Sequence, residues 1–138
     1  MKIKMLESGV PAGSGRTALQ VVVAVASVVP IAAGAIGVLL GPAMLGNHAA
    51  DAPDLDSHFR YLSGLLLGIG LAYASSVRRI ERHRQRFLLL GGIVVIGGLG
   101  RLLAALAMRE ASPTTIFALV MELLVTPALT LWQHRIAR

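Results

Sequence analysis

The sequence predicts an all-α integral membrane protein, an antiparallel bundle of four transmembrane helices. Of its 138 residues, 55% are hydrophobic and only 14% are charged, and the mean hydropathy of +0.72 exceeds that of soluble domains. Four windows are apolar enough to cross a bilayer, because about 20 residues at 1.5 Å each span roughly 30 Å of hydrocarbon. Small or polar residues also recur in these windows at helical spacing, as they do where membrane helices touch.

The four windows cover residues 17–40, 58–77, 87–108 and 114–133 and make one membrane domain over residues 17–135. Residues 1–16 are expected to form a flexible cytoplasmic N-terminus. The first window has no charged residue and is about twice as long as the apolar core of a signal peptide. We therefore interpret it as an uncleaved span.

The positions of lysine and arginine predict the orientation. Most of these residues fall on the side that holds both chain ends and the loop after the second window, a side predicted to be cytoplasmic. They are Lys2, Lys4, Arg16, Arg78, Arg79, Arg82, Arg84, Arg86, Arg135 and Arg138. Topology and attraction to anionic lipid explain the basic run RRIERHRQR at 78–86. A nucleic-acid partner is not expected, because no folded reader module is left outside the windows.

Small residues at a spacing of four predict the faces on which the helices pack. In the second window Gly64 and Gly68 follow Arg60, and in the third window Gly97 and Gly98 precede Arg101. The first window contributes a similar seam of small residues, which includes Gly34, Gly37 and Gly41. Pro30 and Pro127 each remove a helical hydrogen bond and are expected to bend the first and fourth helices.

Arg101 and Glu122 are opposite charges inside apolar windows. At 1.5 Å per residue, Arg101 lies roughly 10 Å below the outer end of the third window and Glu122 roughly 12 Å below that of the fourth. A charge at this depth costs about 2.5 to 3.5 kcal/mol unless it is paired or hydrated. We therefore predict a buried salt bridge between Arg101 and Glu122, which either sets helix register or lines a ligand or ion site.

Arg60 leaves two alternatives open. It can reach the outer interface or pair with Asp56 four residues earlier. If it turns inward, the outer half of the bundle holds two arginines against one glutamate. The candidate ligand or ion-pair cluster is then Arg60, Arg101 and Glu122, which suits an anionic group such as a carboxylate or a lipid phosphate.

No metal site, cofactor or catalytic residue is predicted. The His and Asp residues of the outer loop, His48, Asp51, Asp54, Asp56 and His58, match no metal-binding motif. The chain has no cysteine, and no serine is spaced with a histidine and an acid as nucleophilic catalysis would need.

Several segments resemble a family of small bacterial four-span membrane proteins catalogued as a domain of unknown function, number 4345. These segments are HFRYLSGLLLGIGL at 58–71, GGLGRLLAAL at 97–106 and MELL at 121–124. The resemblance covers residues 17–135 and implies that Arg60, Gly64, Gly68, the Gly100–Arg101 pair and the Glu122–Leu123 pair belong to the family pattern. The turn REASPT at 109–114 departs from that pattern. The family implies a fold and a membrane location but no activity.

The expected function is that of a non-enzymatic inner-membrane protein, an accessory or ligand-binding component. Its expected partners are the lipid bilayer, an anionic lipid or small anionic ligand, and another membrane protein. The alternative is a small proton-coupled transporter or channel, because an unpaired Glu122 in the membrane would have a raised pKa suited to proton uptake and release. A membrane enzyme acting on lipid is a third class, for which the sequence has no recognisable catalytic set.

Overall fold

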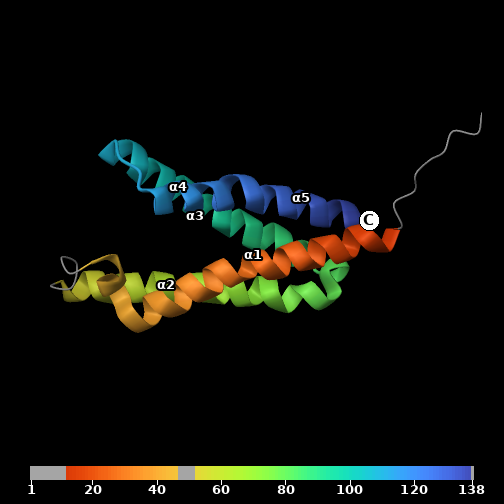
Figure 1. Cartoon of the computed structure of the whole chain (residues 1–138), viewed down its shortest axis with the longest axis horizontal. Helices are drawn as coiled ribbons and strands as arrows, with labels where there is room; N and C mark the ends of the chain where they lie inside the picture. The colour runs from red at the N-terminus through yellow and green to blue at the C-terminus, as the bar shows by residue number, and fades with distance from the viewer. Residues whose placement is uncertain (1–11, 47–51, 138) are drawn as a thin grey trace, which may run out of the picture.

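The structure, a computed structural model, describes residues 12–46 and 52–137, and these are almost entirely helical (Figure 1). The elements in chain order are α1 (Ala12–Leu40), η1 (Gly41–Leu45), α2 (Pro53–Ser76), η3 (Val77–Arg82), α3 (Arg84–Met108), α4 (Pro113–Val120), η4 (Met121–Val125) and α5 (Thr126–Ile136). The last three form one continuous helical rod, in which η4 is a turn of π-helix. Residues 1–11 of the expected flexible N-terminus lie outside the described residues. Helix α1 begins at Ala12, five residues before the predicted start of the first span at residue 17.

Three of the described helices are long and apolar enough to cross a membrane: Gly13–Leu45, Arg84–Met108 and Pro113–Ile136. The chain is therefore all-helical and has the features of a membrane protein. The second predicted span is α2, a helix of 24 residues that would reach about 36 Å. The hydropathy of α2 is lowered by the acidic residues of its first turn, by Arg60 and by two terminal serines. Because α2 is not among the three helices that qualify as spans, the four-span bundle stays a prediction.

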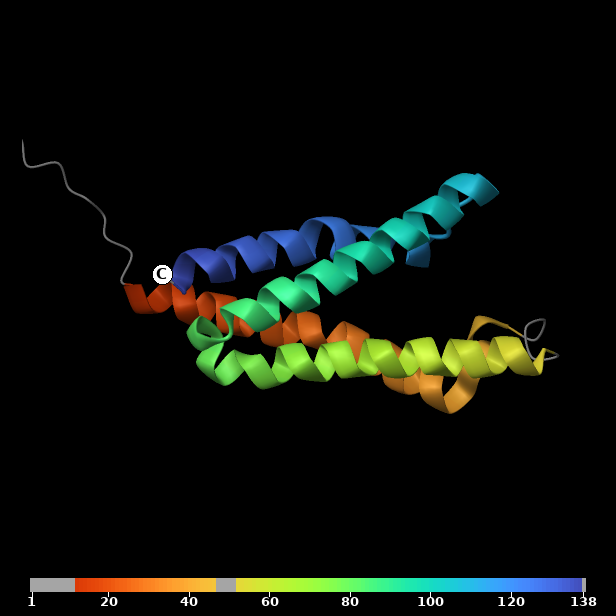
Figure 2. The ribbon, with the colours of Figure 1, turned by 180° about the vertical axis from the view of Figure 1, so that it is seen from behind.

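The helices form two hairpins that meet at one end. Helix α2 packs against α1 over much of its length, and α3 packs against α4, η4 and α5. Between the hairpins, contacts involve mainly η3 and the start of α1 with α5. Toward the opposite end the hairpins diverge, as Figure 2 shows. No extensive packing of α4 against α1 or α2 occurs in the described part of the chain.

The apolar core lies at the end where the hairpins meet. Leu19, Val23, Ile80 and Phe87 are buried there. The ring of Tyr73 meets that of Phe87 edge-on, with centroids 5.2 Å apart, a favourable arrangement of two aromatic rings. Partly buried side chains of α2, η3 and α5 surround this core. The cluster therefore joins the two hairpins.

Two glutamine side chains hold η3 in this core. Gln20 of α1 donates from Nε2 to the carbonyl of Val77 at 2.7 Å, and Gln133 of α5 donates to the carbonyl of Ile80 at 2.7 Å. Gln133 is only 1% exposed, and a buried amide is stable only if it is hydrogen-bonded. The loop between α2 and α3 is thus fastened to the first and last helices.

The proline residues have different surroundings. Helix α1 continues through Pro30. Pro127 follows the π-turn of η4, and the hydroxyl of Thr126 beside it donates to the carbonyl of Met121 at 2.8 Å. Pro127 has no N–H for the regular helical bond, and π-turns are a known way for a helix to absorb such a disruption. At the start of α4, Ser112 is the N-cap, and its side chain accepts a hydrogen bond from the backbone N of Thr115 at 3.2 Å.

Of the four predicted packing glycines, Gly98 lies at a close contact. A Cβ on Gly98 would stand 2.9 Å from Cβ of Glu122, whereas Gly97 and Gly68 have no such neighbour within 4 Å and Gly64 has one at 3.9 Å. Residues spaced four apart, such as Arg60, Gly64 and Gly68, are each rotated by about 40° from the one before, because a helix has 3.6 residues per turn. The later residues of such a series therefore point away from the face on which the helix packs.

The close α1–α2 contact is instead made by the seam predicted for the first helix, together with a glycine that was not predicted. A Cβ on Gly34 would stand 2.8 Å from Cα of Leu67, and a Cβ on Gly70 would stand 2.9 Å from the backbone N of Ile31. Gly37 packs on the side chain of Ser63. Backbone atoms cannot move aside as side chains can, so Gly34 and Gly70 require glycine.

We predict that Gly34→Val destabilises the protein by about 1 to 3 kcal/mol, because the new side chain meets the backbone of Leu67. Gly68→Val is the matched control, because a Cβ at this position would have no neighbour within 4 Å. It should change the free energy of unfolding by less than about 0.5 kcal/mol. Thermal unfolding in detergent, followed by circular dichroism, measures both. Equal losses would contradict this packing.

Candidate functional site

Arg101 of α3 and Glu122 of η4 form a two-point ion pair. Nε of Arg101 donates to Oε2 of Glu122 and Nη2 donates to Oε1, both at 3.1 Å. The fork of a guanidinium matches the two oxygens of a carboxylate, which makes this arrangement stronger than a single contact. The structure thus contains the predicted pair of Arg101 and Glu122.

Local sequence explains why the pair can form. Gly98 lies three residues before Arg101, on the same side of α3, and its lack of a side chain lets Glu122 approach. Leu123 packs on the same glycine. Glu122 is the second residue of the π-turn that precedes Pro127. The close approach of two helix backbones therefore sets the distance between the charges.

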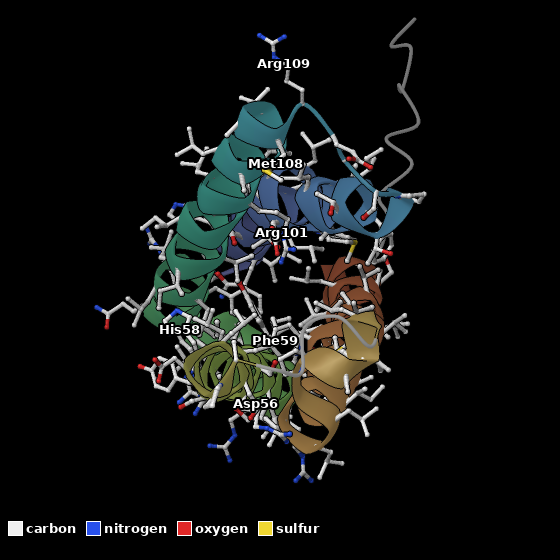
Figure 3. All side chains as sticks on the ribbon, turned by 90° about the vertical axis from the view of Figure 1, so that its left-hand side faces the viewer. Asp56, His58, Phe59, Arg101, Met108 and Arg109 are labelled. Atoms are coloured by element: carbon white, nitrogen blue, oxygen red, sulfur yellow. The ribbon has the colours of Figure 1, made fainter. Side chains whose placement is uncertain are left out.

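The pair is not sealed by protein. The Arg101 side chain is 44% exposed and that of Glu122 is 18% exposed. Figure 3, seen from the end where the hairpins diverge, shows Arg101 directed into the region between them. Its Nη1 has no hydrogen-bond partner in the described part of the chain. The prediction of a buried salt bridge is corrected here, because the hairpins diverge at this level.

Arg60 has other partners. It binds Asp56, with Nε to Oδ2 at 2.8 Å and Nη2 to Oδ1 at 3.2 Å. Its Nη1 also donates to the carbonyls of Val38 at 2.6 Å and Leu39 at 3.0 Å. The regular donor to the Val38 carbonyl would be residue 42, but Pro42 has no N–H. Arg60 therefore closes the end of α1.

Gly41 makes this arrangement possible. Its φ of +60° lies in the left-handed region, which glycine adopts without a steric cost. A Cβ at this position would stand 2.6 Å from Oδ1 of Asp56 and 2.8 Å from Nη2 of Arg60. The expected cluster of Arg60, Arg101 and Glu122 is thus divided between two hairpins: Arg101 and Glu122 are together, and Arg60 is paired with Asp56.

The contacts of Gln20 and Gln133, whose side chains hold η3, were not predicted from the sequence. An amide in an apolar helix was the available signal, since such a group must find a partner when buried. Among the described residues, no three His, Asp or Glu side chains are placed to hold a metal ion. His48 and Asp51 of the outer loop lie outside the described residues.

The apolar helices, their small-residue contacts and the ion pair inside them are features of a small multi-helix membrane protein. The chain belongs to the family described as Domain of unknown function (DUF4345), whose model matches residues 18–133. The resemblance found in the sequence is confirmed by this match. No curated protein and no solved structure matches the chain.

We predict that Arg101→Glu and Glu122→Arg each lower the free energy of unfolding by about 2 kcal/mol or more, because each leaves two like charges facing each other. The double variant restores an opposite pair and should recover more than half of that loss. Thermal unfolding of the four proteins in detergent gives the coupling. A double variant as unstable as the sum of the singles would show that the direct contact contributes nothing.

Proposed function

We propose that this protein is a non-enzymatic, four-span protein of the bacterial inner membrane that binds an anionic ligand beside Arg101. Both chain ends are cytoplasmic in this proposal. The ligand is an anionic lipid or a small anion, and a second membrane protein is the expected partner. A non-enzymatic role is favoured by the sequence, which has no cysteine and no serine spaced with a histidine and an acid.

The observation that carries the proposal is the partial exposure of Arg101 between apolar helices. Glu122 occupies Nε and one N–H of Nη2, so the guanidinium still has donors to offer. An exposed donor next to hydrocarbon is costly unless it is hydrated or bound. A ligand carboxylate or lipid oxygen reaching this level would satisfy it.

The arrangement of the helix ends supports the topology. The start of α1 and the end of α5 lie at the same end of the molecule as η3 (Figures 1 and 2). That end carries most of the arginines, as expected for the cytoplasmic side. Helix α2 packs against α1 along the bundle, and its length of 24 residues suits a span whose polar ends reach the interfaces.

The transporter alternative has weaker support. It depends on an unpaired Glu122. In the structure both oxygens of the Glu122 carboxylate accept hydrogen bonds from Arg101 instead. We therefore favour ligand binding over proton coupling.

Binding of oleate, a carboxylate with an acyl chain, tests the ligand site. Replacing both charges, with Arg101→Gln and Glu122→Gln, should weaken binding by about tenfold or more, because a charge-assisted hydrogen bond is lost. Arg109→Gln is the control, since Arg109 projects from the far end of α3 (Figure 3). Native mass spectrometry of the protein in detergent counts the bound oleate. Equal binding by all three proteins would overturn the proposed site.

The absence of cysteine from the chain allows a clean test of topology. Single cysteines at Asp54, before the bulk of α2, and at Ser112, between α3 and α4, should react with an impermeant maleimide in bacteria with a permeabilised outer membrane. Cysteines at Glu81 and Ala137 should react only after the inner membrane is opened, because these positions are predicted to be cytoplasmic. If the Asp54→Cys and Glu81→Cys variants were labelled from the same side of the membrane, α2 could not be a span.

A further inference from the structure

A second polar site lies at the opposite end of the molecule from the Arg101 pair. Ser75 at the end of α2, Arg78 and Arg79 of η3, and His83 before α3 line an open cavity of about 560 Å³. The cavity is far larger than a water molecule needs. It is formed by the loop whose sequence, RRIERHRQR, was expected to set the topology and to be attracted to anionic lipid, without a defined binding site.

The cavity has positive charge that no acid in the described part of the chain neutralises. The side chains of Arg78 and Arg79 have no hydrogen-bond or ion-pair partner in the described part of the chain. Glu81 is the one acid between residues 77 and 86, and it pairs with Arg16 at 3.2 Å. Two guanidinium groups are therefore available to a ligand.

The backbone that presents these arginines is held on both sides. The Val77 carbonyl accepts from Gln20, the Ile80 carbonyl accepts from Gln133, and the Ile80 side chain is fully buried. Arg78 and Arg79 lie between these two anchored residues and are exposed. A segment fixed in this way loses less conformational freedom when it binds, which favours affinity.

Arg86 contacts one of the residues that line the cavity. Its Nη1 donates to Oγ of Ser75 at 3.2 Å, and Ser75 itself donates to the carbonyl of Ala72 at 2.9 Å. Ser75 thus holds Arg86 in place. The ring of His83, next to Arg84 at the start of α3, also lines the cavity and carries an N–H donor.

We propose that this cavity binds the phosphate of an anionic phospholipid in the cytoplasmic leaflet. Guanidinium groups bind phosphate oxygens through paired hydrogen bonds, and several around one cavity match a phosphate better than a carboxylate. The lipid is favoured as the source because the cavity lies where α3, a helix able to cross a membrane, begins. Basic pockets at that level are where lipid headgroups bind.

The test compares two double variants with the same net charge. Arg78→Gln with Arg79→Gln removes the cavity arginines. Arg82→Gln with Arg135→Gln removes two arginines from the same end of the chain that do not line the cavity. Binding of phosphatidylglycerol to each protein is measured by native mass spectrometry in detergent at about 0.15 M ionic strength, where charges separated by more than about 8 Å are largely screened.

The expected result is that the cavity variant binds phosphatidylglycerol about tenfold more weakly than the control variant, because specific charge-assisted bonds are lost. Equal losses in the two variants would overturn the proposal, since diffuse charge would then explain binding. Inorganic phosphate is the second probe. Suppose that inorganic phosphate binds the unaltered protein, binds the Arg78→Gln, Arg79→Gln variant less well, and displaces phosphatidylglycerol. The ligand would then be free phosphate and not a lipid headgroup. Circular dichroism confirms that both variants are folded.

Discussion

The fold depends on the attachment of one short loop to the first and last helices. Gln20 and Gln133 donate to the carbonyls of Val77 and Ile80, and the buried Ile80 side chain lies in the core that joins the hairpins. Each hairpin has its own internal packing, but the contact between hairpins is concentrated at this end. A buried carbonyl without a donor would be costly, so the two amides stabilise both the loop and the meeting of the hairpins.

The hairpins meet at only one end, and this explains how the charged residues toward the other end are paired. Because the hairpins diverge, each satisfies its own polar groups. Arg60 pairs with Asp56 and closes the end of α1 where Pro42 removes a donor. Arg101 pairs with Glu122 and remains partly exposed. One ion pair thus completes a helix end, whereas the guanidinium of the other keeps a donor, Nη1, with no partner in the described part of the chain. This difference separates a structural arginine from a candidate binding arginine.

Several features were predictable because they depend on local chemistry or on simple helix geometry. The helical rise places Arg101 and Glu122 at similar depth in two neighbouring antiparallel helices, and their pairing follows from the cost of isolated charges in hydrocarbon. The Ser112 cap follows from its position before Pro113. The packing glycines were harder to predict. Gly98 and Gly97 are adjacent in sequence, and only the rotation of α3 against η4 determines which of them touches Glu122.

Composition and periodicity were sufficient to predict that this chain is all-helical and has helices apolar enough to span a membrane, and the resemblance of a few segments identified its family. These properties depend on residues counted along one chain, so no knowledge of neighbours is needed. The tertiary structure decided which partner each arginine has, which glycines lie at helix contacts, and that Arg78 and Arg79 share a cavity. These features depend on how each helix is rotated against its neighbour, which is set by contacts between residues far apart in the sequence.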